Sequence, residues 1–283
     1  MRKRFSLKLR DGSVLQFGER TQVVGVLNVT PDSFSDGGQN FDPKRAVDRA
    51  LEMESEGADI VAVGGESTRP GSERLSADEE LARVVPVLAA LGKRLRVPIA
   101  IDTYKSEVAR VAFDLGARLV NDVSALRFDA ALAGEAARAE AALVLMHMRG
   151  EPATMQKIEP SSDIFGEIKS DFAVAVGEAQ RRGVGREQII LDPGIGFGKT
   201  LEQNLAILNH LERFAGFDMP LMVGTSRKSF IGKLTGRSEG NRLIGTAASV
   251  AAAIIGGAHI VRVHDVSQMV EVAQITDAIL GAD

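Results

Sequence analysis

The chain has 283 residues, 45% of them hydrophobic and 25% charged, a composition typical of a folded globular protein with a large core. Its formal net charge of -4 argues against general nucleic-acid binding, which usually requires a basic excess. The absence of cysteine excludes a cysteine-based zinc site, a cysteine nucleophile and disulfides, and it fits a reducing compartment such as the cytoplasm.

The first twenty residues predict a β-hairpin. Apolar and polar residues alternate in FSLKLR and in SVLQFGE, and Asp11-Gly12 lies between the two segments. The basic segment MRKRFSLKLRDGS is not followed by an apolar core, so we do not expect a secretory signal. We place the hairpin in residues 1–20 and a single larger domain in residues 21–283.

Short apolar runs, each ending in a polar residue or glycine, recur along the larger domain. They cover residues 23–28, 60–65, 99–102, 119–123, 143–147, 189–194, 221–226 and 260–265. Continuous apolar runs are typical of parallel strands buried on both faces. The segments between them have helical periodicity, most clearly over residues 43–57, 78–91, 105–116 and 162–183, and several end at a glycine: Gly57, Gly116 and Gly183.

Eight successive β-α units favour an α/β fold of the (β/α)8 TIM-barrel type. An open, doubly wound sheet is the structural alternative. In a barrel, the hairpin would cover the N-terminal end of the strands. The apolar stretch over residues 244–261 is interrupted by threonine, serine and histidine, so it predicts a packed helix leading into a strand and not a membrane span.

Polar residues follow the apolar runs. In such a barrel the C-terminal ends of the strands face the active site. A single residue at a strand end could simply bond a neighbouring loop, but a ring of them at one mouth predicts a functional site. The ring comprises Asn28, residues 65–69, Asp102, Asn121, Asp122, His147, Asp192, residues 226–228, Arg262 and His264.

The residues of this ring fall into two groups by charge. Asp102, Asn121 and Asp192 offer two carboxylates and an amide, with no obvious partner cation among them. These groups suit a planar heterocycle rich in N–H donors. They could equally bind a divalent metal or act as an acid and a base, and spacing does not separate these possibilities because the residues come from different strands.

The other half of the ring is cationic and indicates an anionic group on the ligand. It consists of Arg69, Lys228, Arg262 and His264. The last two strands are the usual phosphate side of such barrels, and TSRKSFIGKL opens a helix whose backbone N–H groups can assist.

Two long loops, over residues 28–43 and 64–76, are rich in Gly, Pro, Ser and Asp. We expect them to close over the site and exclude water, although they could be plain connectors. The aromatic Phe34 in the first loop favours a contact role.

At these residues the chain closely resembles the dihydropteroate synthases, from Val23 to Val266. The resemblance rests on NVTPDSFSDGG, GGESTRPG, IDTYK, NDVSAL, MHMRGEPATMQ, LDPGIGFGKT, GTSRKSFIG and RVHDV. IDT, NDV and LDPG occur across pterin-binding barrels, whereas NVTPDSFSDGG, ESTRPG and SRKSF in that order are specific. Arg149 stands where glutamine is more usual, in a loop outside the core site.

The resemblance implies that 6-hydroxymethyl-7,8-dihydropterin pyrophosphate condenses with 4-aminobenzoate, releasing pyrophosphate and forming 7,8-dihydropteroate in folate biosynthesis. It implies a catalytic role for Asp32, Asp102 and Lys228. It also implies a pterin site of Asp102, Asn121, Met146, Asp192 and Lys228, a pyrophosphate site of Thr68, Arg69, Arg262 and His264, an aminobenzoate site of Pro70, Phe197 and Ser226, and Mg2+ bound by Asn28.

The resemblance further implies a sulfonamide target that is a cytoplasmic homodimer, with GTAASVAAAIIGG as the candidate surface. We expect no nucleic-acid or membrane partner. The main competing hypothesis is a pterin-dependent methyltransferase domain, which shares the Asp/Asn/Asp pocket but needs no pyrophosphate cluster. Two further hypotheses are a Schiff-base aldolase that uses Lys228 and a non-catalytic pterin-binding paralogue.

Overall fold

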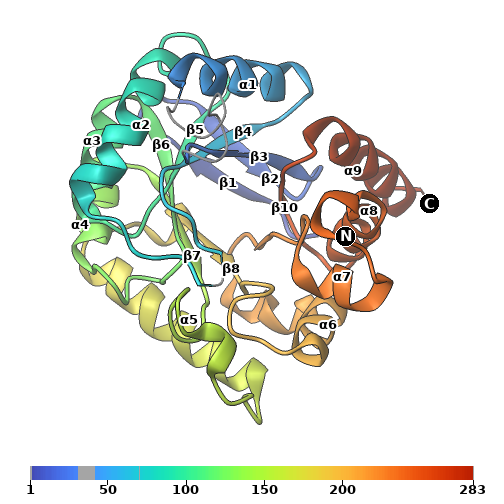
Figure 1. Ribbon diagram of the computed structural model, residues 1–283. Coiled ribbons are helices and arrows are strands. Elements are labelled where there is room, and N and C mark those ends of the chain that lie inside the picture. The colour runs from blue at the N-terminus through green and yellow to red at the C-terminus, as the bar shows by residue number, and fades with distance from the viewer. Residues whose placement is uncertain (1, 31–41, 70, 283) are drawn as a thin grey trace.

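The computed structural model describes residues 2–30, 42–69 and 71–282. Its main sheet has eight strands in the order β8-β7-β6-β5-β4-β3-β10-β9, and neighbouring strands run parallel. A parallel bridge between Leu191 and Leu221 joins β8 to the start of β9, with Leu191 N donating to Pro220 O at 3.0 Å. The sheet is therefore a nearly closed barrel surrounded by helices (Figure 1). The predicted (β/α)8 barrel is confirmed and the open-sheet alternative is wrong.

The barrel strands match the eight apolar runs. They are β3 (Gln22–Asn28), β4 (Ile60–Gly64), β5 (Ile99–Asp102), β6 (Ala117–Asp122), β7 (Ala142–Met146), β8 (Ile189–Asp192), β9 (Met222–Val223) and β10 (Ile260–Val263). Several runs were predicted to extend further than the strands do. In the run over residues 189–194 the strand stops at Asp192 because Pro193 has no N–H and Gly194 has a left-handed φ of 67°.

The outer layer consists of α1 (Pro43–Ser55), α2 (Ala77–Leu91), α3 (Ser106–Asp114), α4 (Ala131–Arg138), α5 (Ile164–Arg181), α6 (Leu201–Asn209), α7 (Ser229–Thr235), α8 (Leu243–Ile255) and α9 (Val266–Leu280). Short 3-10 segments are η1 (Met155–Lys157), η2 (Arg186–Gln188), η3 (Leu211–Phe217) and η4 (Glu239–Asn241). The four clearest helix predictions are confirmed within a few residues. Gly57, Gly116 and Gly183 follow their helices with φ of 99°, 108° and 95°, which glycine adopts without strain.

Side chains alternate along each strand between the helices and the barrel interior. Val23, Val61 and Val261 belong to the core cluster that packs on the helices. Val24, Ile60 and Ile260 belong to the interior cluster. This period of two decides which strand-end side chains reach the site, because only the inward series continues into the barrel mouth.

The predicted hairpin consists of β1 (Phe5–Lys8) and β2 (Val14–Phe17), paired antiparallel. Its side chains Leu7, Leu15 and Phe17 are buried with the interior residues of the barrel strands. Gln22, the first residue of β3, donates from Nε2 to Gln16 O at 3.2 Å. The hairpin therefore closes the N-terminal end of the barrel.

The apolar stretch over residues 244–261 forms most of α8 and the start of β10, as the sequence predicts. In the parts of the chain that the structure describes, no helix is both long and apolar enough to cross a membrane.

Candidate active site

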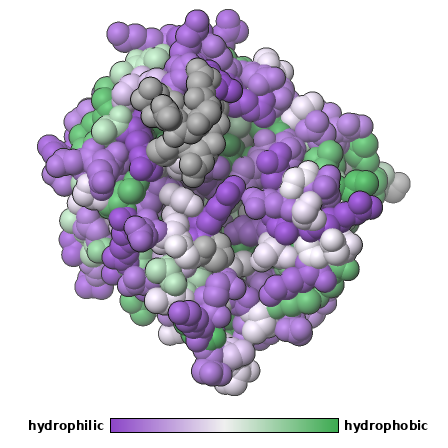
Figure 2. Space-filling model, in the orientation of Figure 1, coloured by the Kyte–Doolittle hydropathy of each residue, from purple (hydrophilic) through white to green (hydrophobic). Residues whose placement is uncertain are grey.

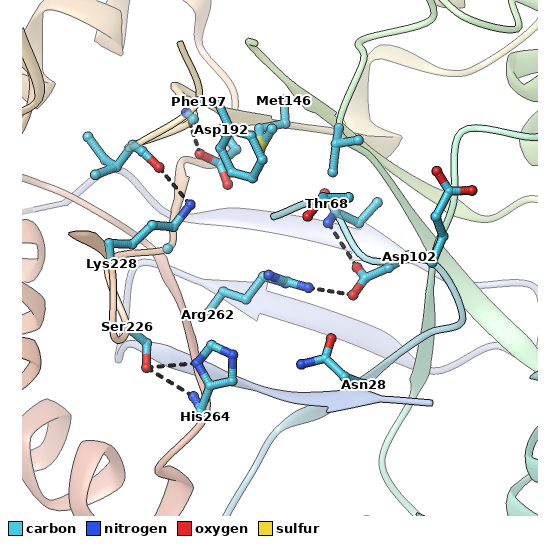
Figure 3. Close-up of a pocket in the computed structure, with 16 residues that line it drawn as sticks. Asn28, Thr68, Asp102, Met146, Asp192, Phe197, Ser226, Lys228, Arg262 and His264 are labelled. Carbon is cyan, nitrogen blue, oxygen red and sulfur yellow. Dashed lines mark hydrogen bonds and ion pairs between the residues drawn. The ribbon is translucent and has the colours of Figure 1, made fainter. Parts of the chain in front are cut away.

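A polar pocket lies at the C-terminal end of the barrel, directly above the apolar interior cluster. Asp102 follows the inward Ala100 by two residues, and Asn121 and Asp192 stand in the same relation to Leu119 and Ile190. Figure 3 shows the side chains of Asp102 and Asp192 pointing toward a common space. The lining residues are Asn28, Glu66, Thr68, Asp102, Asn121, Val123, Met146, Asp192, Gly194, Ile195, Phe197, Gly224, Ser226, Lys228, Arg262 and His264.

Asp102 lies at the centre of a polar chain across the pocket. Its Oδ1 accepts a hydrogen bond from Asn121 Nδ2 at 2.9 Å, and its Oδ2 forms an ion pair with Arg262. Two buried atoms of this chain, Asn121 Oδ1 and Arg262 Nε, have no hydrogen-bond partner among the described residues. Buried polar atoms are nearly always paired, so these two atoms are available to a ligand.

This arrangement changes the division by charge expected from the sequence. Arg262 was assigned to the cationic half of the site, yet it pairs with Asp102 of the carboxylate half. Asp102 therefore has a partner cation that comes from outside the group of Asp102, Asn121 and Asp192. The reason is register: inward residues of β5 and β10 project across the barrel axis and meet, although they lie 160 positions apart in sequence.

Asp192 and Lys228 form the second centre of charge. The Asp192 carboxylate accepts from Gly194 N at 2.7 Å, and Lys228 Nζ donates to Ile195 O at 2.6 Å while lying 3.9 Å from the centroid of the Phe197 ring. Burial raises the pKa of Asp192, and burial lowers the pKa of Lys228 to about 7 despite the opposing charge of Asp192. Lys228 can thus exchange a proton with a hydrogen-bonded ligand near neutral pH.

The third group lies at the rim of the pocket. His264 Nδ1 and its backbone N both lie within hydrogen-bond distance of Ser226 Oγ, at 3.0 Å and 3.2 Å (Figure 3). Burial, followed by the charge of Arg262, lowers the pKa of His264 to about 4. The imidazole is therefore neutral at pH 7 in the ligand-free site, and an arriving anion would favour its charged form.

Some predicted residues are not brought into the pocket. The Arg69 side chain is 71% exposed and lies 3.2 Å from Glu239. Arg227 pairs with Asp265, and the Asp122 carboxylate accepts from the backbone N–H groups of Ser124 and Leu126 at 2.8 Å and 2.6 Å. His147 is buried but does not line the pocket. The predictions for Asp32, Phe34 and Pro70 fall outside the described residues.

The sequence reasoning missed two neighbouring groups. Lys199 extends its ammonium into the loop that carries Phe197. Lys105 forms ion pairs with Glu66, which lines the pocket, and with Glu80, which is buried. Two signals in the sequence could have found them. Lys199 stands among the glycines of GIGFGK, and Lys105 ends the motif IDTYK close to a strand end.

Comparison with known proteins identifies the family of the chain. The family model described as pterin binding enzyme matches residues 24–264. A dihydropteroate synthase of Synechocystis sp. is 47% identical over 268 residues, which cover 94% of this chain and 93% of the relative. The crystal structure of the Yersinia pestis dihydropteroate synthase in a sulfonamide complex superposes with a TM-score of 0.92 at 40% identity, covering 99% of this chain and all of that one (100%).

A second solved structure is the Xanthomonas albilineans dihydropteroate synthase with 4-aminobenzoic acid. It superposes with a TM-score of 0.90 at 37% identity and covers 98% of this chain and 100% of that one. The matches span nearly the full length of each protein. The chain therefore belongs to the pterin-binding enzyme family and, within it, to the dihydropteroate synthases.

Proposed function

We propose that this pocket is the site at which the chain condenses 6-hydroxymethyl-7,8-dihydropterin pyrophosphate with 4-aminobenzoate. The chain is a transferase of folate biosynthesis, as its relatives are. The observation that carries the assignment is the closed ring of inward polar residues, Asp102, Asn121 and Asp192, with Lys228 beside them, in a member of this family. A methyltransferase is not retained, because the curated relatives over nearly the whole chain are dihydropteroate synthases.

The pterin fits the deep part of the pocket. Asp102, Asn121 and Asp192 present acceptor oxygens to its N–H groups, and the unpartnered Asn121 Oδ1 is one of them. Lys228 supplies a donor for the ring, and Met146 supplies an apolar contact from the end of β7. Asp192 and Lys228 both have perturbed pKa values, which supports a binding role for this cluster.

The pyrophosphate would lie toward His264, Arg262 and Thr68 at the rim. The role of Arg69 stays a prediction, since its exposed side chain would have to leave Glu239. Asn28 points its carboxamide into the same space, and no hydrogen bond ties it to another described residue (Figure 3). An amide oxygen completed by substrate phosphates and water is a donor set that suits Mg2+, so we assign Asn28 as its protein ligand.

The aminobenzoate would lie nearer the mouth, against the Phe197 ring and Ser226. Both residues lie beyond the ends of their strands, above Asp192 and Gly224. The structure of the Xanthomonas albilineans relative with 4-aminobenzoic acid supports this compound as the second substrate. Pro70, the third predicted contact, lies outside the described residues.

These positions support a dissociative reaction. The bond between the pterin methylene carbon and the pyrophosphate oxygen breaks, and its electron pair leaves with pyrophosphate. When bound, Mg2+ supplies charge neutralisation for that leaving group. Arg262 and His264 add to it, while the Asp102 carboxylate stabilises the cationic pterin methylene. The aniline nitrogen then forms the new C–N bond and releases a proton. A catalytic role for Asp32 stays a prediction.

One measurement tests the assignment. Purified protein is given the dihydropterin pyrophosphate, with and without 4-aminobenzoate and Mg2+, and pyrophosphate release is followed. We expect release to require both additions and to be matched by dihydropteroate formation. Release that 4-aminobenzoate does not stimulate would refute the synthase function. Inhibition by a sulfonamide that competes with 4-aminobenzoate would support the location of the outer subsite.

We also propose a cytoplasmic homodimer formed through α8 and α9. These helices expose Leu243, Ile244 and Ile255, and Ile275, Ile279 and Leu280, respectively. Figure 2 shows hydrophobic residues on the edge where Figure 1 places α9. Exposed apolar residues grouped on adjacent helices are typical of subunit interfaces. Ile244 is 85% exposed, so Ile244→Glu should convert the dimer to monomers in sedimentation velocity, whereas the matched surface change Val174→Glu on α5 should not.

A further inference from the structure

Lys199 lies outside the pocket lining, at the end of the segment DPGIGFGK that follows β8. Its ammonium donates to three backbone carbonyls: Gly194 O at 2.8 Å, Phe197 O at 3.2 Å and His147 O at 3.2 Å. No carboxylate of the described residues forms an ion pair with it within 4.0 Å. A protonated lysine has three N–H donors, so these carbonyls use all of them.

The three carbonyls converge because the loop turns through left-handed glycines. Gly194, Gly196 and Gly198 have φ of 67°, 87° and 67°. A Cβ at Gly194 would lie 1.9 Å from His147 O, so the loop packs directly on the end of β7. Converging carbonyl oxygens repel one another unless a cation lies between them, and the Lys199 ammonium occupies that position.

The loop held in this way supplies several contacts of the active site. Its Ile195 O accepts a hydrogen bond from the Lys228 ammonium, and its Phe197 ring lies against that Lys228 ammonium. Its Gly194 N donates to the Asp192 carboxylate. On the other side, Gly196 N donates to Asn204 Oδ1 at 2.6 Å, which attaches the loop to α6.

We propose that Lys199 is a positioning residue for the synthase reaction: its ammonium, by binding the carbonyl oxygens of Gly194, Phe197 and His147, fixes the 194–197 loop on the end of β7. It therefore sets where Phe197 meets the aminobenzoate and holds Gly194 N against the Asp192 carboxylate that faces the pterin. This inference rests on the proposed function of the pocket. It concerns a residue that touches neither substrate.

The charges around the two groups agree with this role. Asp192 faces Lys228, Arg262 and Lys199, whose charges all oppose the rise of its pKa that burial causes. Lys199 faces Asp192 and Glu167, which favour its charged form, and Lys228 and Arg149, which disfavour it. Burial lowers the pKa of Lys199 to about 7. Loss of the Lys199 charge would therefore allow Asp192 to hold its proton to a higher pH.

The test compares two substitutions that separate charge from fit. Lys199→Met keeps an unbranched side chain that lacks only the terminal ammonium position, and it loses the charge and all donors. We expect the KM for 4-aminobenzoate to rise about tenfold or more, as for the loss of charged hydrogen bonds. We also expect the pH below which pterin binding fails, measured by calorimetry with a non-reacting pterin, to move upward, because the Lys199 charge opposes the rise of the Asp192 pKa.

Lys199→Arg keeps the charge, but its planar fork does not match three converging carbonyls. It should raise the KM for 4-aminobenzoate while leaving the acid limit of pterin binding in place. If Lys199→Met does not fold, the arginine variant still decides the charge argument: an acid limit that moves in Lys199→Arg overturns it.

Thr200→Ala is the matched control. Thr200 Oγ1 accepts from Gln203 N at 3.2 Å and caps α6, so its loss should lower the melting temperature without changing either readout. If Lys199→Met behaves like Thr200→Ala, losing only stability, the positioning role is refuted. Wild-type protein is assayed in parallel. If its pyrophosphate release does not depend on 4-aminobenzoate, the proposed function fails instead, and the pterin calorimetry still judges the charge effect of Lys199.

Discussion

Replacing Asp102 with asparagine should slow the chemical step far more than it weakens pterin binding. The Asp102 side chain is 11% exposed and forms an ion pair with Arg262, which is 25% exposed. Asparagine keeps one acceptor oxygen at nearly the same place but removes the charge. The ground-state pterin is neutral in its ring, so it loses about 1 kcal/mol of hydrogen bonding, equivalent to about a fivefold weaker Kd.

The transition state loses more, because positive charge develops on the pterin methylene as pyrophosphate leaves. Removing one preorganised electrostatic contact of this kind typically costs about 2.7–4 kcal/mol, which corresponds to a fall in kcat of about 100- to 1000-fold. The variant also leaves the Arg262 guanidinium without its partner, which adds to the positive charge facing the reacting carbon.

Steady-state kinetics at saturating 4-aminobenzoate gives kcat, and calorimetry with a non-reacting pterin gives Kd. Asp59→Asn is the control, since Asp59 also accepts from an arginine, Arg20, but at the opposite end of the barrel. It should leave both quantities unchanged. An equal loss in kcat and in pterin affinity for Asp102→Asn would refute a role in the transition state.

Three further results are expected. Burial lowers the pKa of His259 from 6.5 to about 4, so the unfolded chain binds more protons than the folded chain between these pH values. Roughly 3 kcal/mol of stability should therefore be lost as the pH falls from about 6.5 to 4. Urea unfolding should show a smaller loss over this pH range in His259→Gln. Because the pKa of His264 is also lowered to about 4, an anion that favours its charged form should make pyrophosphate binding at pH 7 take up protons. Calorimetry in buffers of different ionisation enthalpy should detect this, and His264→Gln should reduce it to the share that Lys228 contributes. Gly194→Ala should destabilise the protein far more than Gly12→Ala: both glycines have positive φ, at 67° and 84°, but only at Gly194 does an added Cβ meet backbone, and equal losses in urea unfolding would contradict this.

The sequence predicted most of the fold because its signals are local. Each barrel strand is a buried apolar run, and each of the four clearest helices shows a 3.6-residue period, so neither depends on distant contacts. The positions of Asp102, Asn121 and Asp192 at one mouth followed from the barrel itself.

Pairing across the barrel was not predictable in the same way. The ion pair of Asp102 with Arg262 depends on the register of two distant strands. The exposure of Arg69 depends on how its loop folds beside Glu239. Lys199 was missed although it stands among the glycines of GIGFGK, because its partners are backbone carbonyls that no residue type identifies.

The hairpin that fills the N-terminal end of the barrel has a kinetic consequence. Leu7, Leu15 and Phe17 occupy the N-terminal end, so ligands reach Asp102 from the C-terminal end, where Phe197, Ser226 and His264 line the pocket. Access from this end imposes an order on substrate binding and product release. The pterin must arrive before the aminobenzoate, which would otherwise stand in its path, and pyrophosphate must leave by the route along which the next pterin enters.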